Sequence, residues 1–137
     1  ASQAIDRVIN FFPEERHLQV RAALALNLRA IVAQRLVRTV KGDQVVAMEV
    51  LLNEAFIKEL IMKGDTVRIK EVMSNNKPAG MVVFDQSLFR LYVDGEIDEK
   101  TAIIEADIPA DMKMRIQQHK LSGGQGVESV DTSRLSL

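Results

Sequence analysis

The stretch AIVAQRLVRTVKGDQVVAMEVLL, residues 30–52, decides the fold. Apolar and β-branched residues fill both of its ends, and Lys41-Gly42-Asp43 between them is a turn signal. The stretch predicts a β-hairpin with strands over about residues 30–40 and 44–52. Because two strands alone make a weak sheet, the hairpin also predicts further strands. These could come from preceding sequence, from another protomer or from strand exchange in a dimer.

Two helices are predicted before the hairpin. The first covers residues 1–12, and Pro13 ends it and suits the start of a second helix over about residues 14–28. The first helix has one apolar face, made by residues at the helical spacing i, i+3, i+4 and i+7: Ile5, Val8, Ile9 and Phe12.

After the hairpin, apolar stripes and helix-start signals predict about five short helices. Asn53, Thr66 and Asp98 are the predicted N-caps, and Pro109 is a predicted first-turn proline. Residues 122–137, SGGQGVESVDTSRLSL, are rich in Gly and Ser and predict a flexible tail. The predicted fold class is therefore α/β: two helices, a β-hairpin and a cluster of short helices.

Composition excludes several classes of function. The 137 residues carry a formal net charge of −1, so no overall basic field points to nucleic acid or an anionic membrane. The absence of cysteine excludes disulfides, thiolate metal ligands and a cysteine nucleophile, and it fits a reducing cytoplasm. No apolar run is long enough to span a bilayer, and no signal-peptide pattern is present. Five Phe, one Tyr and no Trp disfavour a stacking platform for single-stranded nucleic acid.

No motif in the chain predicts a self-contained active site. A phosphate loop needs Gly-x4-Gly-Lys-Ser/Thr; Gly123, Gly124 and Gly126 lack the Lys-Ser/Thr end and indicate a linker. His17 and His119 are far apart in sequence and lack zinc-ligand spacing. We therefore predict no catalytic residue and no metal ligand in this chain.

Four basic residues, Arg29, Arg35, Arg38 and Lys41, lie in or beside the predicted hairpin. They could be exposed charges that discourage edge-to-edge pairing of strands. Alternatively, one arginine could reach a phosphate or an acidic neighbour across a subunit interface, which suits the planar guanidinium. The sequence leaves both interpretations open.

Several sequence segments resemble one family, the type IV pilus retraction ATPases of the PilT/PilU type. The segments are SQAIDRVINFFPEER (2–16), AQRLV (33–37), EVLLN (49–53), AFIKELI (55–61) and GMVVFDQSL (80–88). The resemblance covers about residues 1–118. Lys58 and Glu59 stand where the family usually has Arg and Asn, which leans toward PilU-like members. Val82 and Val83 replace the usual Gln-Thr.

The resemblance implies the C-terminal fragment of a RecA-like ATPase domain. Residues 1–53 would end the ATPase core, residues 54–121 would form a helical subdomain, and residues 122–137 would be the tail. The intact protein would be a cytoplasmic hexamer at the inner membrane that uses ATP and Mg²⁺ to power pilus retraction and twitching motility. Its partners would be the retraction machinery and the membrane platform. This chain lacks the phosphate loop, acidic strand and histidine box, so it should not hydrolyse ATP alone.

The resemblance also implies site residues. The retraction motif, which would couple nucleotide state to the pilus machinery, corresponds to Ala55, Phe56, Ile57, Lys58, Glu59, Leu60 and Ile61. Core packing is the alternative explanation for Ile57, Leu60 and Ile61, so Lys58 and Glu59 are the better interaction candidates. Gln34 and Arg35 are weaker candidates for contact with nucleotide or with a neighbouring subunit. A competing hypothesis is a standalone protein-interaction module without a nucleotide role.

Overall fold

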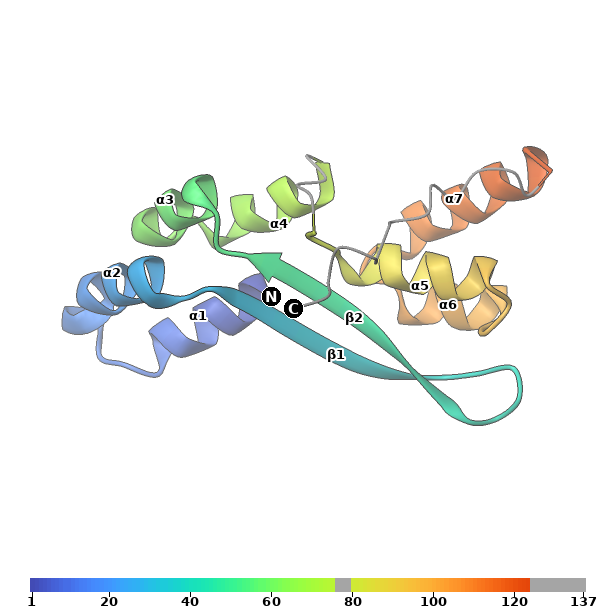
Figure 1. The fold of residues 1–137 in the computed structure, drawn as a ribbon, viewed down its shortest axis with the longest axis horizontal. Helices are drawn as coiled ribbons and strands as arrows, with labels where there is room; N and C mark the ends of the chain where they lie inside the picture. Colours follow the sequence, from blue (N-terminus) through green and yellow to red (C-terminus); the bar gives the residue numbers. More distant parts are fainter. Residues whose placement is uncertain (76–79, 124–137) are drawn as a thin grey trace.

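The computed structural model describes residues 1–75 and 80–123. Two helices, a two-stranded antiparallel sheet and five further helices follow one another along the described chain, as the sequence predicts, and confirm the α/β class (Figure 1). The elements are α1 (Ser2–Asn10), the 3-10 turn η1 (Glu14–Arg16), α2 (His17–Asn27), β1 (Ala30–Arg38), β2 (Gln44–Leu52), α3 (Ala55–Lys63), α4 (Thr66–Asn75), α5 (Phe84–Val93), α6 (Glu99–Glu105) and α7 (Pro109–Leu121).

The hairpin forms with the predicted turn. Ile31 pairs with Leu51 and Val37 with Val45 across the antiparallel ladder. At the turn, the Thr39 backbone N–H donates to the Asp43 carbonyl at 2.9 Å. Gly42 has φ of +94°, a conformation that side chains with a Cβ rarely adopt. The first strand ends at Arg38, two residues before its predicted end.

The two faces of the hairpin differ in burial because side chains alternate along each strand. The inner face carries buried Val37, Ala47 and Leu51. The outer face is apolar but exposed to solvent. Its large side chains, with their exposed fractions, are Val32 (57%), Leu36 (60%), Val46 (39%) and Met48 (44%).

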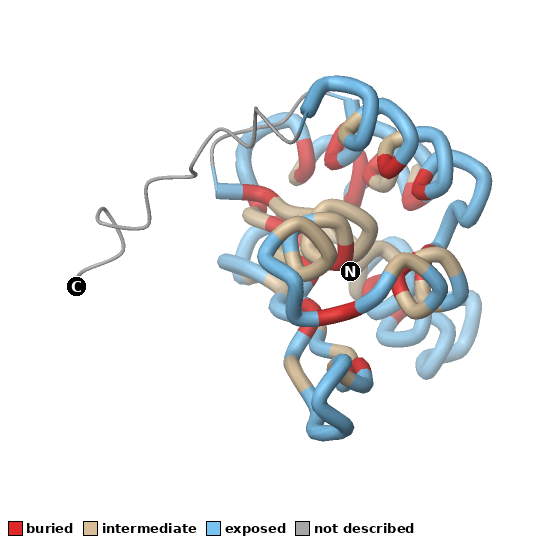
Figure 2. Tube along the Cα trace, turned by 90° about the vertical axis from the view of Figure 1, so that its right-hand side faces the viewer, coloured by how far each residue is buried: buried red, intermediate tan, exposed pale blue. Residues whose placement is uncertain are grey.

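The helices form two groups at the two ends of the hairpin (Figure 1). In both groups, buried and exposed residues alternate along the chain (Figure 2). We call α1–α4 with the adjoining strand ends the first lobe, and α5–α7 with the turn end of the hairpin the second lobe. The buried core of the first lobe is Ile5, Ile9, Ala25, Leu51, Ile57, Leu60, Ile61, Ile69, Val72, Met73 and Met81. The buried core of the second lobe is Val37, Ala47, Leu88, Ile97, Ala102, Ala106, Met112 and Ile116.

The apolar face predicted for the first helix is only half buried. Ile5 and Ile9 are 1% and 7% exposed, whereas Val8 and Phe12 are 44% and 39% exposed. The helix also ends at Asn10, two residues early. Within this chain, the predicted face is therefore buried at Ile5 and Ile9 and exposed at Val8 and Phe12.

Two of the three predicted N-caps are wrong. Glu54, not Asn53, precedes α3, and the Asp65 carboxylate, not Thr66, accepts the Arg68 backbone N–H at 3.2 Å at the start of α4. Asp98 caps α6 as predicted, accepting from the Thr101 backbone N–H at 2.7 Å. Pro109 opens α7, also as predicted.

The predicted tail falls mostly outside the described residues, which end at Gly123. The predicted boundary between residues 53 and 54 remains a prediction; in the structure, helices from both sides of it share the core of the first lobe. In residues 1–75 and 80–123, every helix is too short or too polar to cross a membrane.

Candidate functional site

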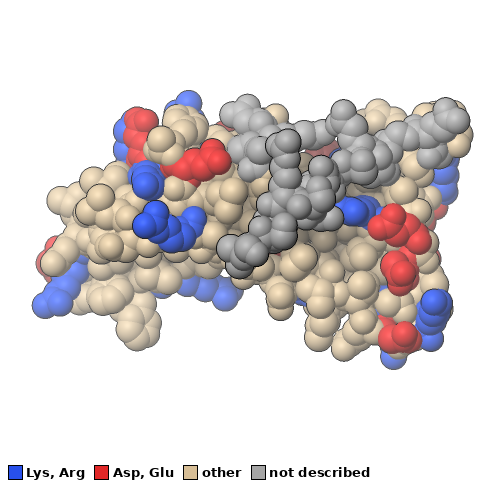
Figure 3. Space-filling model, in the orientation of Figure 1, with Lys and Arg blue, Asp and Glu red and all other residues tan. Residues whose placement is uncertain are grey.

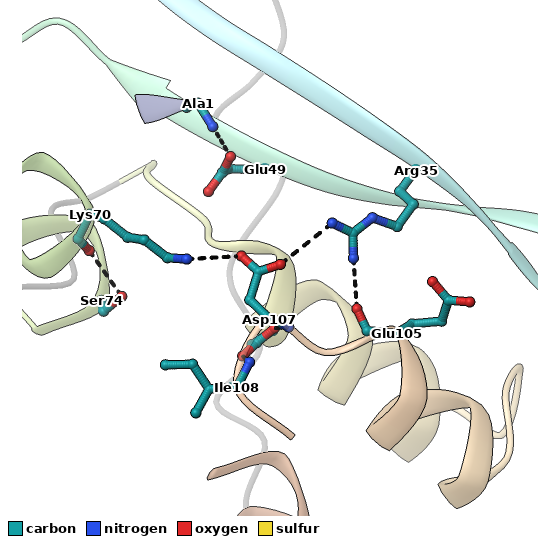
Figure 4. Close-up of polar contacts among 9 residues, drawn as sticks. Ala1, Arg35, Glu49, Lys70, Ser74, Glu105, Asp107 and Ile108 are labelled. Carbon is teal, nitrogen blue, oxygen red and sulfur yellow. Dashed lines mark hydrogen bonds and ion pairs between the residues drawn. The ribbon is translucent and has the colours of Figure 1, made fainter. Parts of the chain in front are cut away.

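An acidic side chain lies between two basic ones where the lobes approach each other (Figure 4). The Asp107 carboxylate contacts Lys70 Nζ at 3.2 Å and Arg35 Nη2 at 3.4 Å. Lys70 comes from α4 of the first lobe, Arg35 from β1, and Asp107 from the loop between α6 and α7. The carboxylate is 29% exposed, so solvent screens both pairs only in part. The three residues therefore tie three separate elements together.

Arg35 is fixed by two further contacts. Its Nη1 donates to the Glu105 carbonyl at 2.6 Å, at the C-terminal end of α6. Its guanidinium lies 4.5 Å from the centre of the Phe84 ring. Strand alternation explains this placement, because Arg35 shares the inner face with buried Val37. A cation at the negative end of a helix is also electrostatically favourable.

Asp85 holds the loop that carries Asp107. Its carboxylate accepts the backbone N–H groups of Asp107 at 2.7 Å and Ile108 at 3.1 Å. These groups stand at the start of α7, where N–H groups lack partners inside the helix. Asp85 thus aligns α7 with α5 and positions the Asp107 side chain toward Lys70 and Arg35.

A cleft of about 240 Å³ lies beside these residues, against the middle of the inner face of the hairpin. Glu49, only 6% exposed, contributes a carboxylate beside the start of α1. The residues that line the cleft and matter here are Arg7, Ala33, Arg35, Glu49, Lys70 and Asp107. Both basic and acidic side chains line it, so it has no field of one sign.

The structure places Gln34 and Arg35 on opposite faces of β1. Gln34 is exposed on the outer face, while Arg35 is half-buried on the inner face. The two side chains therefore do not meet at one site. Of the other basic residues beside the turn, Arg38 and Lys41 are exposed.

The predicted retraction motif forms α3 and its two faces separate cleanly. Ile57, Leu60 and Ile61 are at most 2% exposed and belong to the core of the first lobe. Ala55, Phe56 and Glu59 are exposed, and Lys58 is half-buried. The motif thus combines a packing face with a solvent-facing surface, as its spacing predicts.

Polar contacts organise the exposed surface of α3. Lys63 Nζ lies 2.5 Å from the Glu59 carboxylate one turn earlier, and this hydrogen bond lowers the pKa of Glu59. The Arg68 guanidinium lies 5.9 Å from the centre of the Phe56 ring. The helix ends at Gly64, and Arg21 Nη1 donates to the Lys63 carbonyl at 3.3 Å there. Acidic and basic groups occur in small groups elsewhere on the surface as well (Figure 3).

The described residues contain no group of three or more His, Cys, Asp or Glu side chains placed to hold a metal ion. His17 Nε2 lies 2.8 Å from the Phe12 carbonyl. His119 packs edge-on against the rings of Phe89 and Tyr92. Each histidine therefore has a local structural partner.

Sequence reasoning missed three residues of the site where the lobes approach each other: Lys70, Asp85 and Asp107. Carboxylates near helix ends are common, so Asp85 and Asp107 carried no distinctive signal. The one available hint was an aspartate two residues before Pro109, where a helix start leaves backbone donors to be satisfied. Lys70 follows buried Ile69 on α4, and only the packing of the lobes reveals its partner.

Comparison with known proteins supplies a family. The chain is 42% identical over 138 aligned residues to the type IV pilus ATPase PilU of Pseudomonas aeruginosa, covering 100% of this chain and 36% of that protein. It is 29% identical over 109 residues to the retraction ATPase PilT of the same organism, covering 80% of this chain and 32% of PilT. A twitching motility protein of Neisseria gonorrhoeae is 30% identical over 74% of the chain. No protein-family model matches the chain.

Solved structures agree with the sequence comparison. A crystal structure of the pilus retraction motor PilT with bound ADP superposes with a TM-score of 0.72 at 28% identity, over 83% of this chain and 32% of that one. The Legionella pneumophila ATPase DotB, at 17% identity and a TM-score of 0.61, shares the fold. The chain spans about a third of the length of these relatives. In sequence and in fold, the chain belongs to the PilT/PilU family of type IV pilus ATPases and corresponds to a C-terminal portion of such a protein.

Proposed function

We propose that this chain forms the C-terminal part of a hexameric cytoplasmic ATPase that powers type IV pilus retraction and twitching motility at the inner membrane. The identity to PilU over the whole chain and the shared fold with ADP-bound PilT support the proposal. In the whole protein, ATP and Mg²⁺ would bind mainly through residues outside this chain. The chain has no phosphate loop and would not hydrolyse ATP alone.

The observation that carries the proposal is the open edge of β1. Val50 of β2 exchanges both backbone hydrogen bonds with Val82, at 2.8 and 3.0 Å, so its N–H and C=O point away from β1. The alternation of an antiparallel ladder then turns the backbone groups of Val32, Gln34 and Leu36 away from β2. Within the described residues these groups have no backbone partner.

The outer face of the hairpin supports the same conclusion. Four large apolar side chains are exposed there, two from each strand. A sheet with an open edge and an uncovered apolar face is suited to receive more strands and a covering layer. We assign the strands that would pair with this edge, and the layer that would cover this face, to the rest of the motor's ATPase core. Residues 1–53 would then form the end of that core.

The surface of α3 is the proposed point of coupling to the retraction machinery. The exposed residues Ala55, Phe56 and Glu59 and half-buried Lys58 would meet the partner, while Ile57, Leu60 and Ile61 anchor the helix in the first lobe. Residues 54–121 would act as the helical subdomain. Gln34 on the outer face would be the nearer of the two β1 candidates to a neighbouring layer or subunit.

Hydrolysis by the longer protein tests the motor assignment. The full-length protein should hydrolyse ATP in the presence of Mg²⁺ and sediment as a hexamer, and the 137-residue chain should do neither. A matched substitution tests the open face: Leu36→Lys should leave the isolated chain unaffected but lower the melting temperature and hydrolysis rate of the full-length protein. Equal tolerance in both contexts would show that the outer face stays uncovered.

The coupling role has a separate test. Replacing Lys58 and Glu59 together by Ala in the full-length protein should reduce twitching while ATP hydrolysis stays near normal. Lys113→Ala on the exposed side of α7 is the matched control. Normal twitching by the double variant at normal expression would remove α3 as the coupling surface.

One observation favours the alternative of a standalone interaction module. Each lobe has its own buried core, and together they cover the whole inner face of the hairpin except its middle. A module of this kind would be a monomer with a cooperative thermal transition. It would bind its partner with or without the nucleotide-binding portion.

A further inference from the structure

Helices of the two lobes make few contacts with one another, although Met81 and Val83, which lead into α5, pack in or against the first core. The helix pairs with extensive contacts, such as α1 with α4, α2 with α3 and α6 with α7, all lie within one lobe. The cores meet the hairpin at different places: Leu51 belongs to the first core, while Val37 and Ala47 belong to the second. Between them lies the cleft beside Ala33 and Glu49. The middle of the hairpin therefore faces this cleft and the start of α1, not either apolar core.

Across this cleft, one ion pair joins helix α4 to the second lobe. Lys70 Nζ on α4 lies 3.2 Å from the Asp107 carboxylate in the α6–α7 loop (Figure 4). The other ion-pair partner of Asp107 is Arg35, which also donates to the Glu105 carbonyl. Asp85 fixes the loop from within the second lobe. Breaking the Lys70 contact would thus leave Asp107 held on its own side.

We propose that the middle of the hairpin is a hinge between the lobes and that the Lys70–Asp107 pair is the latch that closes it. Lys70 is 45% exposed and Asp107 is 29% exposed, so water competes for both charges. Exposed pairs of this type contribute little to stability and weaken with salt. A latch of this strength opens without unfolding either core. The inference rests on the geometry of this chain and not on the motor function proposed above.

A distance measurement between the lobes tests the latch directly. The chain contains no cysteine, so cysteines for spin labels can be placed on exposed positions of each lobe, Val67 on α4 (73% exposed) and Met114 on α7 (52% exposed). The experiment uses the full-length protein with any cysteines outside this chain replaced. Pulsed electron–electron double resonance then gives the distribution of distances between the two labels.

The expected result is one narrow distribution for the parent protein and a broader or shifted one for Lys70→Met. Lys70→Arg should restore the narrow distribution, because it keeps the charge. Lys63→Met removes a lysine that pairs within α3 and should change nothing. An unchanged distribution for Lys70→Met would overturn the proposal.

A second measurement needs no substitution at the latch. Raising the ionic strength to about 1 M shortens the screening length to about 3 Å and should broaden the distribution in the parent protein. The Lys70→Met protein, with its latch already open, should respond little to the same salt. A parent distribution that stays narrow in high salt would also overturn the proposal, whatever the effect of Lys70→Met on folding.

Discussion

The side-chain amide of Asn53 donates to the carbonyl of Leu28 at 2.8 Å, across 25 residues of sequence. The same amide donates to the Ala25 carbonyl at 3.1 Å, and the Asn53 backbone N–H donates to Arg29 at 2.9 Å. Asn53 is 8% exposed and directly follows β2. It therefore satisfies carbonyls at the C-terminal end of α2 and fixes where that helix meets the hairpin.

Asn53→Ala should destabilise the chain by about 1–3 kcal/mol, because it leaves buried carbonyls unpaired. Asn53→Asp should be worse, since a carboxylate cannot donate and would face the same carbonyls. Urea unfolding measures both. Asn27→Ala is the matched control, because the Asn27 amide contacts the Ala23 carbonyl on an exposed surface. Equal losses at positions 27 and 53 would contradict the assigned role.

Gly64→Ala should destabilise the chain more than Gly42→Ala. Both glycines have positive φ, +73° and +94°, which costs a side chain about 1–2 kcal/mol. Only at Gly64 would the new Cβ also meet a neighbour, Arg21 Nη1 at 2.6 Å; nothing lies within 4 Å at Gly42. Adding Arg21→Ala to Gly64→Ala should recover the difference. Denaturant titrations of the three variants would show it, and identical losses for the two glycines would count against it.

Asp85→Ala should cost about 0.5–2 kcal/mol, the usual range for a lost helix cap, because two backbone donors lose their acceptor. Asp85→Asn should cost less, since one oxygen remains. Asp94→Ala is the control: Asp94 lies 3.8 Å from Arg90 on an exposed surface and should contribute almost nothing. Hydrogen exchange at the start of α7 should rise in Asp85→Ala only. Unchanged protection there would refute the assignment.

Asp98 should give α6 a stability that depends on pH. Its side-chain hydrogen bond with Thr101 lowers the pKa of Asp98 below the ordinary aspartate value. A lowered pKa stabilises the folded state above the unfolded pKa of about 3.9, and that contribution is lost as pH falls through the folded value. The difference in melting temperature between the parent and Asp98→Ala should thus be full at pH 7 and narrow below about pH 4. A difference that stays constant from pH 7 to pH 3 would contradict this.

The elements of this fold are readable from sequence because each has a local cause. The turn at Gly42, the break at Pro13 and the cap at Asp98 act within a few residues of themselves. Asn53 and Thr66 are wrong as caps because both side chains are buried. The Asn53 amide donates to the Leu28 carbonyl at the end of α2, and Thr66 is 9% exposed. Propensity at these positions is overridden by burial.

The candidate site was predictable only where it lies on one element. The division of α3 into buried Ile57 and exposed Glu59 follows from helical spacing. The meeting of Lys70 with Asp107 spans 37 residues and depends on how two lobes sit on one hairpin. No local pattern encodes that separation, so a single sequence could not indicate it.

The open edge of β1 has a practical consequence for anyone producing this segment by itself. Unpaired backbone donors and acceptors on an uncovered edge strand can pair with the edge strand of another molecule. Two copies of the segment paired in this way would extend the sheet and start aggregation. Proline is tolerated on an edge strand where its missing N–H faces solvent. Gln34→Pro should therefore block association through the edge while the ladder with β2 remains, and the segment could be studied at high concentration.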